Sequence, residues 1–261
     1  MITSAYILPH SPLLIPSIGK ENILRISETE RAVSAIVLEI ANDKPDIIFI
    51  ITSHGIELEN SFAINLAMEY NLNFEEFGDF TNQKILYPDL ELINSIKQRL
   101  ESTNLLKFLT RSKLNHAMSV PLYYVLQKYT NFKIVPIHTA KVDLRAHYDF
   151  GKMLKPMLIE SDKKITIITS GELSHRLSEN SPTGYLPQAK KFDQKVIQYI
   201  LDKATDKLFK MDEAQIEKMH ECGLKPSCLL LGILDQYNFT PSSLSYEKPF
   251  GVGHFVAKME M

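Results

Sequence analysis

The stretch Asp46-Ile-Ile-Phe-Ile-Ile-Thr-Ser-His54-Gly55 decides the fold of this chain of 261 residues. Its continuous apolar run is typical of a strand buried on both faces of a largely parallel sheet. Open α/β sheets bind their ligands at the carboxyl ends of such strands. The run ends abruptly in polar residues, so we predict that His54 lies at the mouth of a site and that Gly55 lets the backbone turn away.

Two other apolar runs also lead directly into a histidine. They are Ser4-Ala-Tyr-Ile-Leu-Pro-His10 and Lys164-Ile-Thr-Ile-Ile-Thr-Ser-Gly-Glu-Leu-Ser-His175. A helical pattern over 22–42 connects the first run with the central one, which indicates a right-handed βαβ unit. We therefore expect His10 and His54 to follow neighbouring strands, where both imidazoles can converge on one point.

The rest of the chain predicts a single α/β domain over residues 1–261, in which helices cover both faces of a mixed or mostly parallel central sheet. Further strands are expected at 61–68 and 132–137, and a strand pair within 244–257. The acidic, aromatic segment 71–87 has no clear period and is interpreted as a surface excursion near the site. Helices are expected at 89–101, after Asn115-His116, at 143–160, around 192–201, at 212–220 and at 226–234.

The apolar content is ordinary for a globular protein. A net charge of −2 gives no indication of a nucleic-acid partner. The two cysteines, Cys222 and Cys228, are too few for a disulfide framework, which favours a reducing, cytoplasmic compartment. Prolines break the start of the chain, which is unlike a signal peptide, and no run approaches the ~20 apolar residues that span a bilayer. We expect a soluble protein without membrane contact.

Two converging imidazoles suit a transition-metal ion, for which neutral histidine is the commonest protein ligand. Two histidines and one carboxylate with open positions are typical of iron(II), Fe(II), that binds substrate and dioxygen. The missing donor is predicted at the end of the short helix 212–220. There Glu221 offers a carboxylate and Cys222 a thiolate, and the two alternatives imply different metals.

His175 is a candidate general base, because an imidazole pKa lies near the working pH. Glu172 competes with it for acid–base work or for a metal. His116 is a second candidate in the catalytic site, as a hydrogen-bond donor, or is merely the first residue of a helix. Arg176 is a weaker candidate for holding the substrate. Three further histidines, His138, His147 and His254, are expected to be structural. No P-loop, dinucleotide fingerprint, Cys-x-x-Cys or His-Glu-x-x-His pattern is present.

Over nearly its full length the chain resembles the class III extradiol ring-cleavage dioxygenases, of the protocatechuate 4,5-dioxygenase β-subunit type. The resemblance is carried by Pro9-His10-Ser-Pro-Leu-Leu-Ile-Pro16, Thr52-Ser-His54-Gly55 and Gly171-Glu-Leu-Ser-His175. Two further segments, Glu221-Cys-Gly-Leu and Ser245-Tyr-Glu-Lys-Pro-Phe-Gly-Val-Gly253, are similar to a branch associated with the AmmeMemoRadiSam system. The related Memo family shares the Cys-Gly-x-x-Pro context seen at Cys222.

The resemblance implies that His10 and His54 bind iron and that His175 acts as the base. The third ligand of the dioxygenases falls at Glu221 or at Cys222, where the Memo family has a metal-associated thiol. The family's Asp-His-Gly segment stands here as Asn115-His116-Ala117, which is a departure.

The implied function is a non-haem Fe(II) extradiol dioxygenase that acts on a catechol- or aminophenol-type aromatic ring with O2. The alternatives are a Memo-like metal-, ligand- or partner-binding protein, with Zn or Cu in the site, and a zinc hydrolase. A homo-oligomer or a partner from the AmmeMemoRadiSam system is a further expectation.

Overall fold

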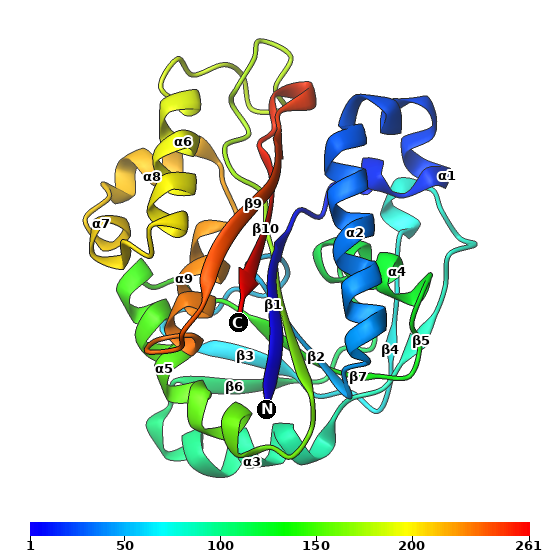
Figure 1. Cartoon of the computed structure of the whole chain (residues 1–261), viewed down its shortest axis with the longest axis vertical. Coiled ribbons are helices and arrows are strands. Elements are labelled where there is room, and N and C mark those ends of the chain that lie inside the picture. Colours follow the sequence, from blue (N-terminus) through cyan, green and yellow to red (C-terminus); the bar gives the residue numbers. More distant parts are fainter.

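The structure is a computed structural model that describes residues 1–261. Its centre is an eight-stranded sheet in the order β6-β3-β7-β2-β8-β1-β10-β9 (Figure 1). The strands are β1 (Ile2–Leu8), β2 (Ile47–Thr52), β3 (Phe62–Asn65), β6 (Leu106–Leu109), β7 (Lys133–His138), β8 (Ile165–Ser170), β9 (Thr240–Glu247) and β10 (His254–Glu260). The four central strands β7, β2, β8 and β1 run parallel, as do β3 and β6, while the β3–β7, β1–β10 and β10–β9 pairs are antiparallel. The predicted mixed, mostly parallel α/β sheet is confirmed.

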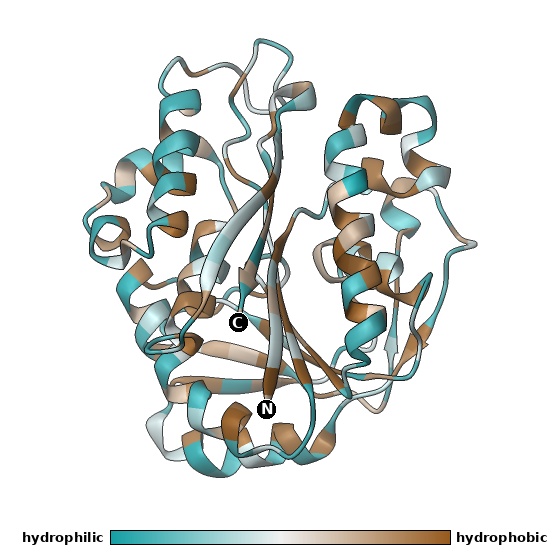
Figure 2. Ribbon diagram, viewed as in Figure 1, coloured by the Kyte–Doolittle hydropathy of each residue, from teal (hydrophilic) through white to brown (hydrophobic).

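Helices cover both faces of this sheet. One face is covered by α3 (Leu90–Leu100), α5 (Leu144–Glu160), α6 (Ala189–Leu201) and α9 (Leu224–Ile233), and the other by α2 (Ser27–Asp43) and α4 (His116–Leu126). The remaining helices are α1 (Pro16–Gly19), α7 (Thr205–Phe209) and α8 (Glu213–Met219). Figure 1 shows α2 on one side of the central strands and α5 and α9 on the other, and in Figure 2 the apolar colouring follows the strands.

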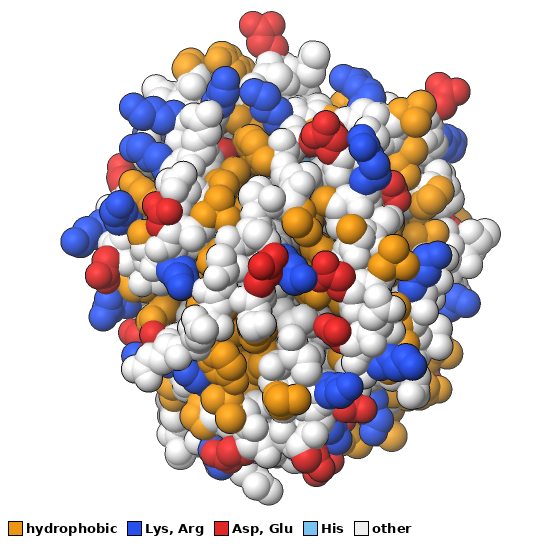
Figure 3. Space-filling view, in the orientation of Figure 1, with side chains coloured by type: hydrophobic (Ala, Val, Ile, Leu, Met, Phe, Trp, Pro, Cys, Tyr) orange, Lys and Arg blue, Asp and Glu red, His pale blue; other side chains and the backbone are white.

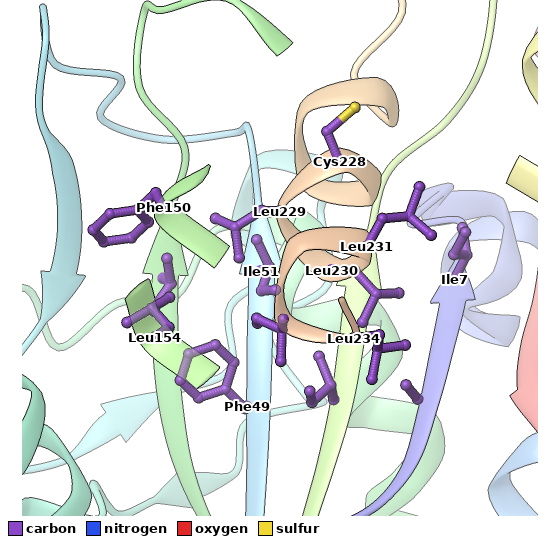
Figure 4. Packing of buried hydrophobic residues seen from close by; sticks show 14 of the residues in the cluster. Ile7, Phe49, Ile51, Phe150, Leu154, Cys228, Leu229, Leu230, Leu231 and Leu234 are labelled. Carbon is purple, nitrogen blue, oxygen red and sulfur yellow. The ribbon is translucent and has the colours of Figure 1, made fainter. Parts of the chain in front are cut away.

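Strand β2 explains why both faces need a cover. Alternate side chains of a strand point to opposite faces, so Phe49 and Ile51 join the core under α5 and α9, while Ile48 and Ile50 join the core under α2 and α4. Figure 4 shows Leu229 and Leu230 of α9 packed beside Ile51. Burying each such side chain contributes roughly 1.5–3 kcal/mol. Because side chains on both of its faces are buried in this way, the continuous apolar run forms a central strand of the sheet.

The order of the strands corrects one prediction. β8 lies between β1 and β2 and pairs with both, so His10 and His54 do not follow neighbouring strands. Both strands still point the same way, and their carboxyl ends flank that of β8. The two histidines therefore reach toward one another across the end of β8.

Local differences from the sequence analysis are few. Residues Lys20–Ile26 form a 3-10 helix rather than the start of α2, and β6, α1 and α7 were not predicted. The excursion over 71–87 is more ordered than expected: β4 (Tyr70–Asn71) pairs with β5 (Ile85–Leu86), and the Leu72 and Phe74 side chains are buried. Further 3-10 turns occur at Pro12–Leu14, Glu75–Phe77, Glu101–Thr103 and Pro249–Gly251.

The surface is mixed in charge. Figure 3 shows acidic and basic side chains interspersed over one face, in keeping with the small net charge of −2. None of the helices combines the length and apolar character that crossing a bilayer requires. Both cysteines are free thiols.

Candidate metal centre

Three histidines meet at the carboxyl ends of the parallel strands. His10 follows β1, His54 follows β2, and the centroids of their rings are 4.6 Å apart. His116, the first residue of α4, lies beside both, with its ring centroid 5.4 Å from that of His10 and 5.0 Å from that of His54. The structure thus brings His10, His54 and His116 into one cluster, with edge-on contacts between the rings.

Hydrogen bonding fixes the protonation pattern of His10. The Ser170 hydroxyl, at the end of β8, donates its only hydrogen to the Ala117 carbonyl, so its oxygen accepts a hydrogen bond from His10 Nδ1 at 3.0 Å. His10 Nε2 is therefore left with a free lone pair. Burial lowers the pKa of His10 to about 3, so the ring is neutral near pH 7. This is the form in which imidazole binds a metal ion.

His54 is held by its backbone. The carbonyl of His54 accepts hydrogen bonds from Asn115 Nδ2 and His138 Nδ1, each at 2.9 Å. The next residue, Gly55, has a φ of 104°, in a region where a Cβ would be strained. His54 Nε2 is buried and has no hydrogen-bond partner, and burial lowers the His54 pKa to about 4. A buried ring nitrogen of a neutral histidine without a partner points to a ligand atom or ion.

Cys222 supplies the third donor of the cluster. Its Sγ lies 3.5 Å from His10 Nε2, and the donor atoms of His10, His54 and Cys222 all lie within 4.8 Å of one another. Burial, with the charge of Glu172, raises the pKa of the Cys222 thiol well above its usual range. A bound cation would have to displace that proton, as metals do when they take a thiolate.

Close packing of two loops places this thiol. A Cβ on Gly171 would lie 2.4 Å from Gly223 Cα, so only glycine lets the loop after β8 touch the loop before α9. Across this contact Cys222 N–H donates to the Glu172 carbonyl at 3.0 Å, and Glu172 N–H donates to Cys222 Sγ at 3.2 Å. Ser53 Oγ donates to the Cys222 carbonyl at 2.7 Å.

Glu221 does not join this cluster. Its carboxylate accepts hydrogen bonds from the N–H groups of Gly223 and Leu224 at 2.8 and 2.7 Å, where it caps α9. Burial raises the pKa of Glu221 to about 7. Of the two candidates for the third ligand, the structure brings Cys222, and not Glu221, to the two histidines.

His175 lies beside the buried carboxylate of Glu172. His175 Nδ1 donates to the Leu173 carbonyl at 3.0 Å, and its Nε2 lies 3.3 Å from Glu172 Oε2. Burial opposes the charged form of His175, but the hydrogen bond and charge of Glu172 outweigh it and raise the His175 pKa. Burial would also raise the pKa of Glu172, whereas its histidine neighbours hold it well below its usual range. Of the histidines beside Glu172, His175 is the one whose pKa its carboxylate raises above the usual value.

His254 was expected to be structural, and the structure places it at the site instead. Its Nε2 lies 3.4 Å from Glu172 Oε1, without the alignment of a hydrogen bond, so Glu172 Oε1 and His254 Nδ1 both lack hydrogen-bond partners. His138 also touches the site, through the His54 carbonyl. His147 lies away from it: its Nδ1 donates to the Asp143 carbonyl at 2.7 Å.

The mouth of the site is formed by partly exposed side chains. His116 Nδ1 lies 2.9 Å from Glu76 Oε1, and the Phe77 ring meets that of His116 edge-on at 5.3 Å. Both partners belong to the 71–87 excursion, which therefore reaches the site. The side chains of His116 and His175 are each 21% exposed. Arg176 turns away: its guanidinium donates to the Lys218 carbonyl at 3.3 Å.

The donor set fits a transition-metal ion. Two neutral imidazole nitrogens and one thiol sulfur converge, and one of the nitrogens has no other partner. Two supporting residues, Ser170 and Asn115, were not assigned a role in the site from the sequence, and His254 was assigned a structural one. The signal for Ser170 was its position as the last polar residue of a buried strand, and that for Asn115 was its place before a helix, where it accepts the Met118 N–H as a cap.

Comparisons with known proteins found a family model, a relative and a solved structure that match this chain. A family model described as the catalytic LigB subunit of aromatic ring-opening dioxygenase matches residues 4–257. Protein CA_C1420 of Clostridium acetobutylicum is 33% identical over 265 aligned positions, which cover 98% of this chain and 57% of that relative, so the chain spans little more than half its length. The crystal structure of uncharacterized protein JW3007 from Escherichia coli K12 shares the fold, with a TM-score of 0.61, 14% identity and 99% of each chain covered. The chain belongs to the family of LigB catalytic subunits of aromatic ring-opening dioxygenases.

Proposed function

We propose that the chain is a non-haem iron(II) extradiol dioxygenase that opens a catechol- or aminophenol-type ring with O2. The observation that supports this most is the convergence of His10, His54 and Cys222 donor atoms at the carboxyl edge of the sheet, in a member of a ring-opening family. His10 and His54 would hold the metal through Nε2. Cys222 Sγ would take the place that a carboxylate has in the two-histidine, one-carboxylate pattern.

When bound, iron(II) supplies a Lewis-acidic centre that lowers the pKa of a ring hydroxyl and reacts with O2. Ser170 would orient the His10 ring through Nδ1, and the Asn115 and His138 side chains would hold the His54 loop. Such supporting contacts fix the tautomer and direction of a ligand. The chain thus contributes a preorganised set of neutral donors.

His175 would accept the proton of the substrate hydroxyl at Nε2. Its Nδ1 is fixed by the Leu173 carbonyl, so the ring cannot shift its tautomer without losing that bond. The Glu172 carboxylate, 3.3 Å away, stabilises the imidazolium that forms. With 21% of its side chain exposed, His175 is reachable from the mouth of the site, where Phe77 offers an aromatic edge to a bound ring.

A second candidate function is favoured by the donor set itself. A thiolate with two imidazoles suits zinc or copper as well as iron. The alternative is therefore a Memo-like protein that binds a metal, a ligand or a partner without cleaving a ring. A homo-oligomer and a partner from the AmmeMemoRadiSam system stay predictions under either function.

The test is anaerobic purification with metal analysis, followed by oxygen uptake against a panel of catechols and aminophenols. We expect about one iron per chain and uptake that a His175→Ala variant abolishes without loss of iron. His220→Asn, at an exposed histidine at the end of α8, serves as the matched control and retains uptake. Zinc or copper in the site, with no uptake against any ring, would reject ring cleavage in favour of the second candidate.

A further inference from the structure

A second group of potential ligands lies beside the first. A Glu172 carboxylate oxygen, His175 Nε2 and Cys222 Sγ all lie within 4.8 Å of one another. The two groups share Cys222 and no other residue. The first group draws on the loops after β1 and β2, whereas the second draws on the loop after β8.

The lone pairs in this second group face one another. The Leu173 carbonyl has no hydrogen to give, so His175 Nδ1 must carry the ring hydrogen in the neutral tautomer. The Nε2 lone pair then points at Glu172 Oε2 across 3.3 Å. Two acceptors at that distance need a proton or a cation between them. Two ligands bound tetrahedrally at Zn–N and Zn–O lengths of about 2.0–2.2 Å stand about 3.3–3.5 Å apart, which matches the observed spacing.

The Glu172 carboxylate has a charge that no lysine or arginine balances. Its ion-pair neighbours are the histidines at 10, 175 and 254. Glu172 is only 6% exposed, and its Oε1 has no hydrogen-bond partner. Leaving a buried carboxylate atom unpaired is costly, on the order of 1–3 kcal/mol or more. The buried carboxylate therefore favours a positive partner, which is either the imidazolium of His175 or a metal cation in its place.

We propose that Glu172, His175 and Cys222 form a second site for a thiophilic divalent cation such as zinc(II), next to the first site and sharing Cys222 Sγ with it. Imidazole, thiolate and carboxylate are the usual ligands of zinc. Paired metals in enzymes stand about 3.5–4 Å apart, a spacing that one shared ligand atom allows. His254 Nε2 lies 3.4 Å from the other carboxylate oxygen, Glu172 Oε1.

Occupation of this second site has a consequence that rests on the proposed function. A cation bound to His175 Nε2 takes the lone pair that the base needs. His175 is then either a base or a ligand, and the second cation inhibits ring opening while the first one supports it. Excess zinc is expected to lower oxygen uptake in the iron-loaded wild type at least tenfold.

The site itself is tested by counting metal ions, without substrate. Metal-free protein is dialysed anaerobically to equilibrium against saturating cobalt(II), and cobalt per chain is measured by mass spectrometry alongside the thiolate-to-cobalt absorption. We expect two ions in the wild type, one in Glu172→Gln and one in His54→Ala. The matched control for the cysteine is Cys228→Ser, a buried thiol outside both groups, which keeps two.

His175→Asn is the second variant, in case Glu172→Gln does not fold as judged by circular dichroism, and it should also bind one ion. A wild type that saturates at one ion, or folded Glu172 and His175 variants that still bind two, overturns the second site. The count is independent of catalysis. Two ions without oxygen uptake would contradict the proposed function alone, whereas one ion with uptake would contradict the second site alone.

Discussion

The amino and carboxyl edges of the parallel strands differ in whether their polar groups have hydrogen-bond or ion-pair partners. At the amino edge a cavity of about 600 Å³ is lined mainly by charged and polar residues, among them Asp46, Asp89, Lys133 and Lys163. Charges are paired there: Lys163 Nζ lies 3.0 Å from Asp89 Oδ2, and Asp46 accepts a backbone N–H at 2.8 Å. At the carboxyl edge, buried polar atoms of His54, Glu172 and His254 have no hydrogen-bond partner.

The difference shows that volume alone does not locate a site in this fold. The amino edge has a hollow, but the pairing of Lys163 with Asp89 and of Asp46 with a backbone N–H serves the stability of the chain. At the carboxyl edge, some buried polar atoms have no hydrogen-bond partner, and the potential metal donors converge on one place. Removal of a side chain should therefore lower the stability of the protein at the amino edge and the affinity for metal at the carboxyl edge.

The largest expected effect is at His54. His54→Ala removes a donor and should weaken metal binding by at least about 100-fold, as removal of a direct ligand exceeds the 10–100-fold of a supporting residue. His54 Nε2 has no partner to lose, so the metal-free protein should unfold at nearly the wild-type urea midpoint. Metal competition assays and urea denaturation measure the two quantities. If the variant is less stable than wild type without metal, and its metal affinity is unchanged, the contrast between the two edges is wrong.

The next largest effect is expected at Ser170, which would influence a bound metal only through its hydrogen bond with His10. Ser170→Ala frees His10 Nδ1 and lets the ring change tautomer, so metal affinity should fall about 10–100-fold. Ser170→Thr keeps the hydroxyl and should restore much of it. Because the metal donors themselves remain, the number of bound ions at saturation should not change. A competition assay with a chelator gives both values, and equal affinities for the alanine variant and the wild type would contradict the role.

A pH experiment sharpens the comparison at Asp193, a buried carboxyl behind the loop that holds His175. Burial raises the pKa of Asp193 from 3.8 to about 6, although hydrogen bonds from Tyr246 Oη and Ser174 N–H work against the rise. A raised pKa means that its contribution to stability is fully present below about pH 4 and is lost as pH rises through about 6.

Asp193→Asn keeps the shape without the charge. The variant should gain stability relative to wild type between about pH 4 and pH 7, on the order of 3 kcal/mol at the upper end. Urea denaturation at four pH values across this window measures the difference. A difference that stays constant with pH would show that Asp193 does not titrate there.

The smallest effect is expected at the amino edge. Asp89 is 1% exposed, caps α3 by accepting the Leu92 N–H at 2.9 Å and pairs with Lys163. Asp89→Ala should lower the free energy of unfolding by about 1–2 kcal/mol, mostly through the lost cap, because Lys163 is partly exposed. Metal affinity should be unchanged, and a drop in it would show that the two edges are coupled.

Much of the fold was predictable because its signals are local. Runs rich in isoleucine mark the six-residue strands β2 and β8, and the turn residues behind them mark the carboxyl edge. The order of strands was not predictable in this way. Which strand enters between β1 and β2 depends on a crossover more than a hundred residues later in the chain, and no local pattern records it.

The third donor was left open between two residues and His254 was missed, for different reasons. Glu221 and Cys222 are adjacent, and the N–H groups of Gly223 and Leu224 decide between them by capturing the glutamate. His254 begins β10, which runs antiparallel to β1. The start of β10 therefore lies at the edge of the sheet where β1 ends. A search for histidines after strands could not find one that comes before a strand.

The position of β8 between β1 and β2 has a consequence for how the protein is made. While the chain emerges from the ribosome, the histidines at 10 and 54 are synthesised early, but the strand that spaces them arrives only with residues 165–170. The thiol at 222 follows still later. A nascent chain or a fragment that stops before β8 cannot present a finished cluster, so cells would load the ion only after the chain through residue 222 has been made and folded.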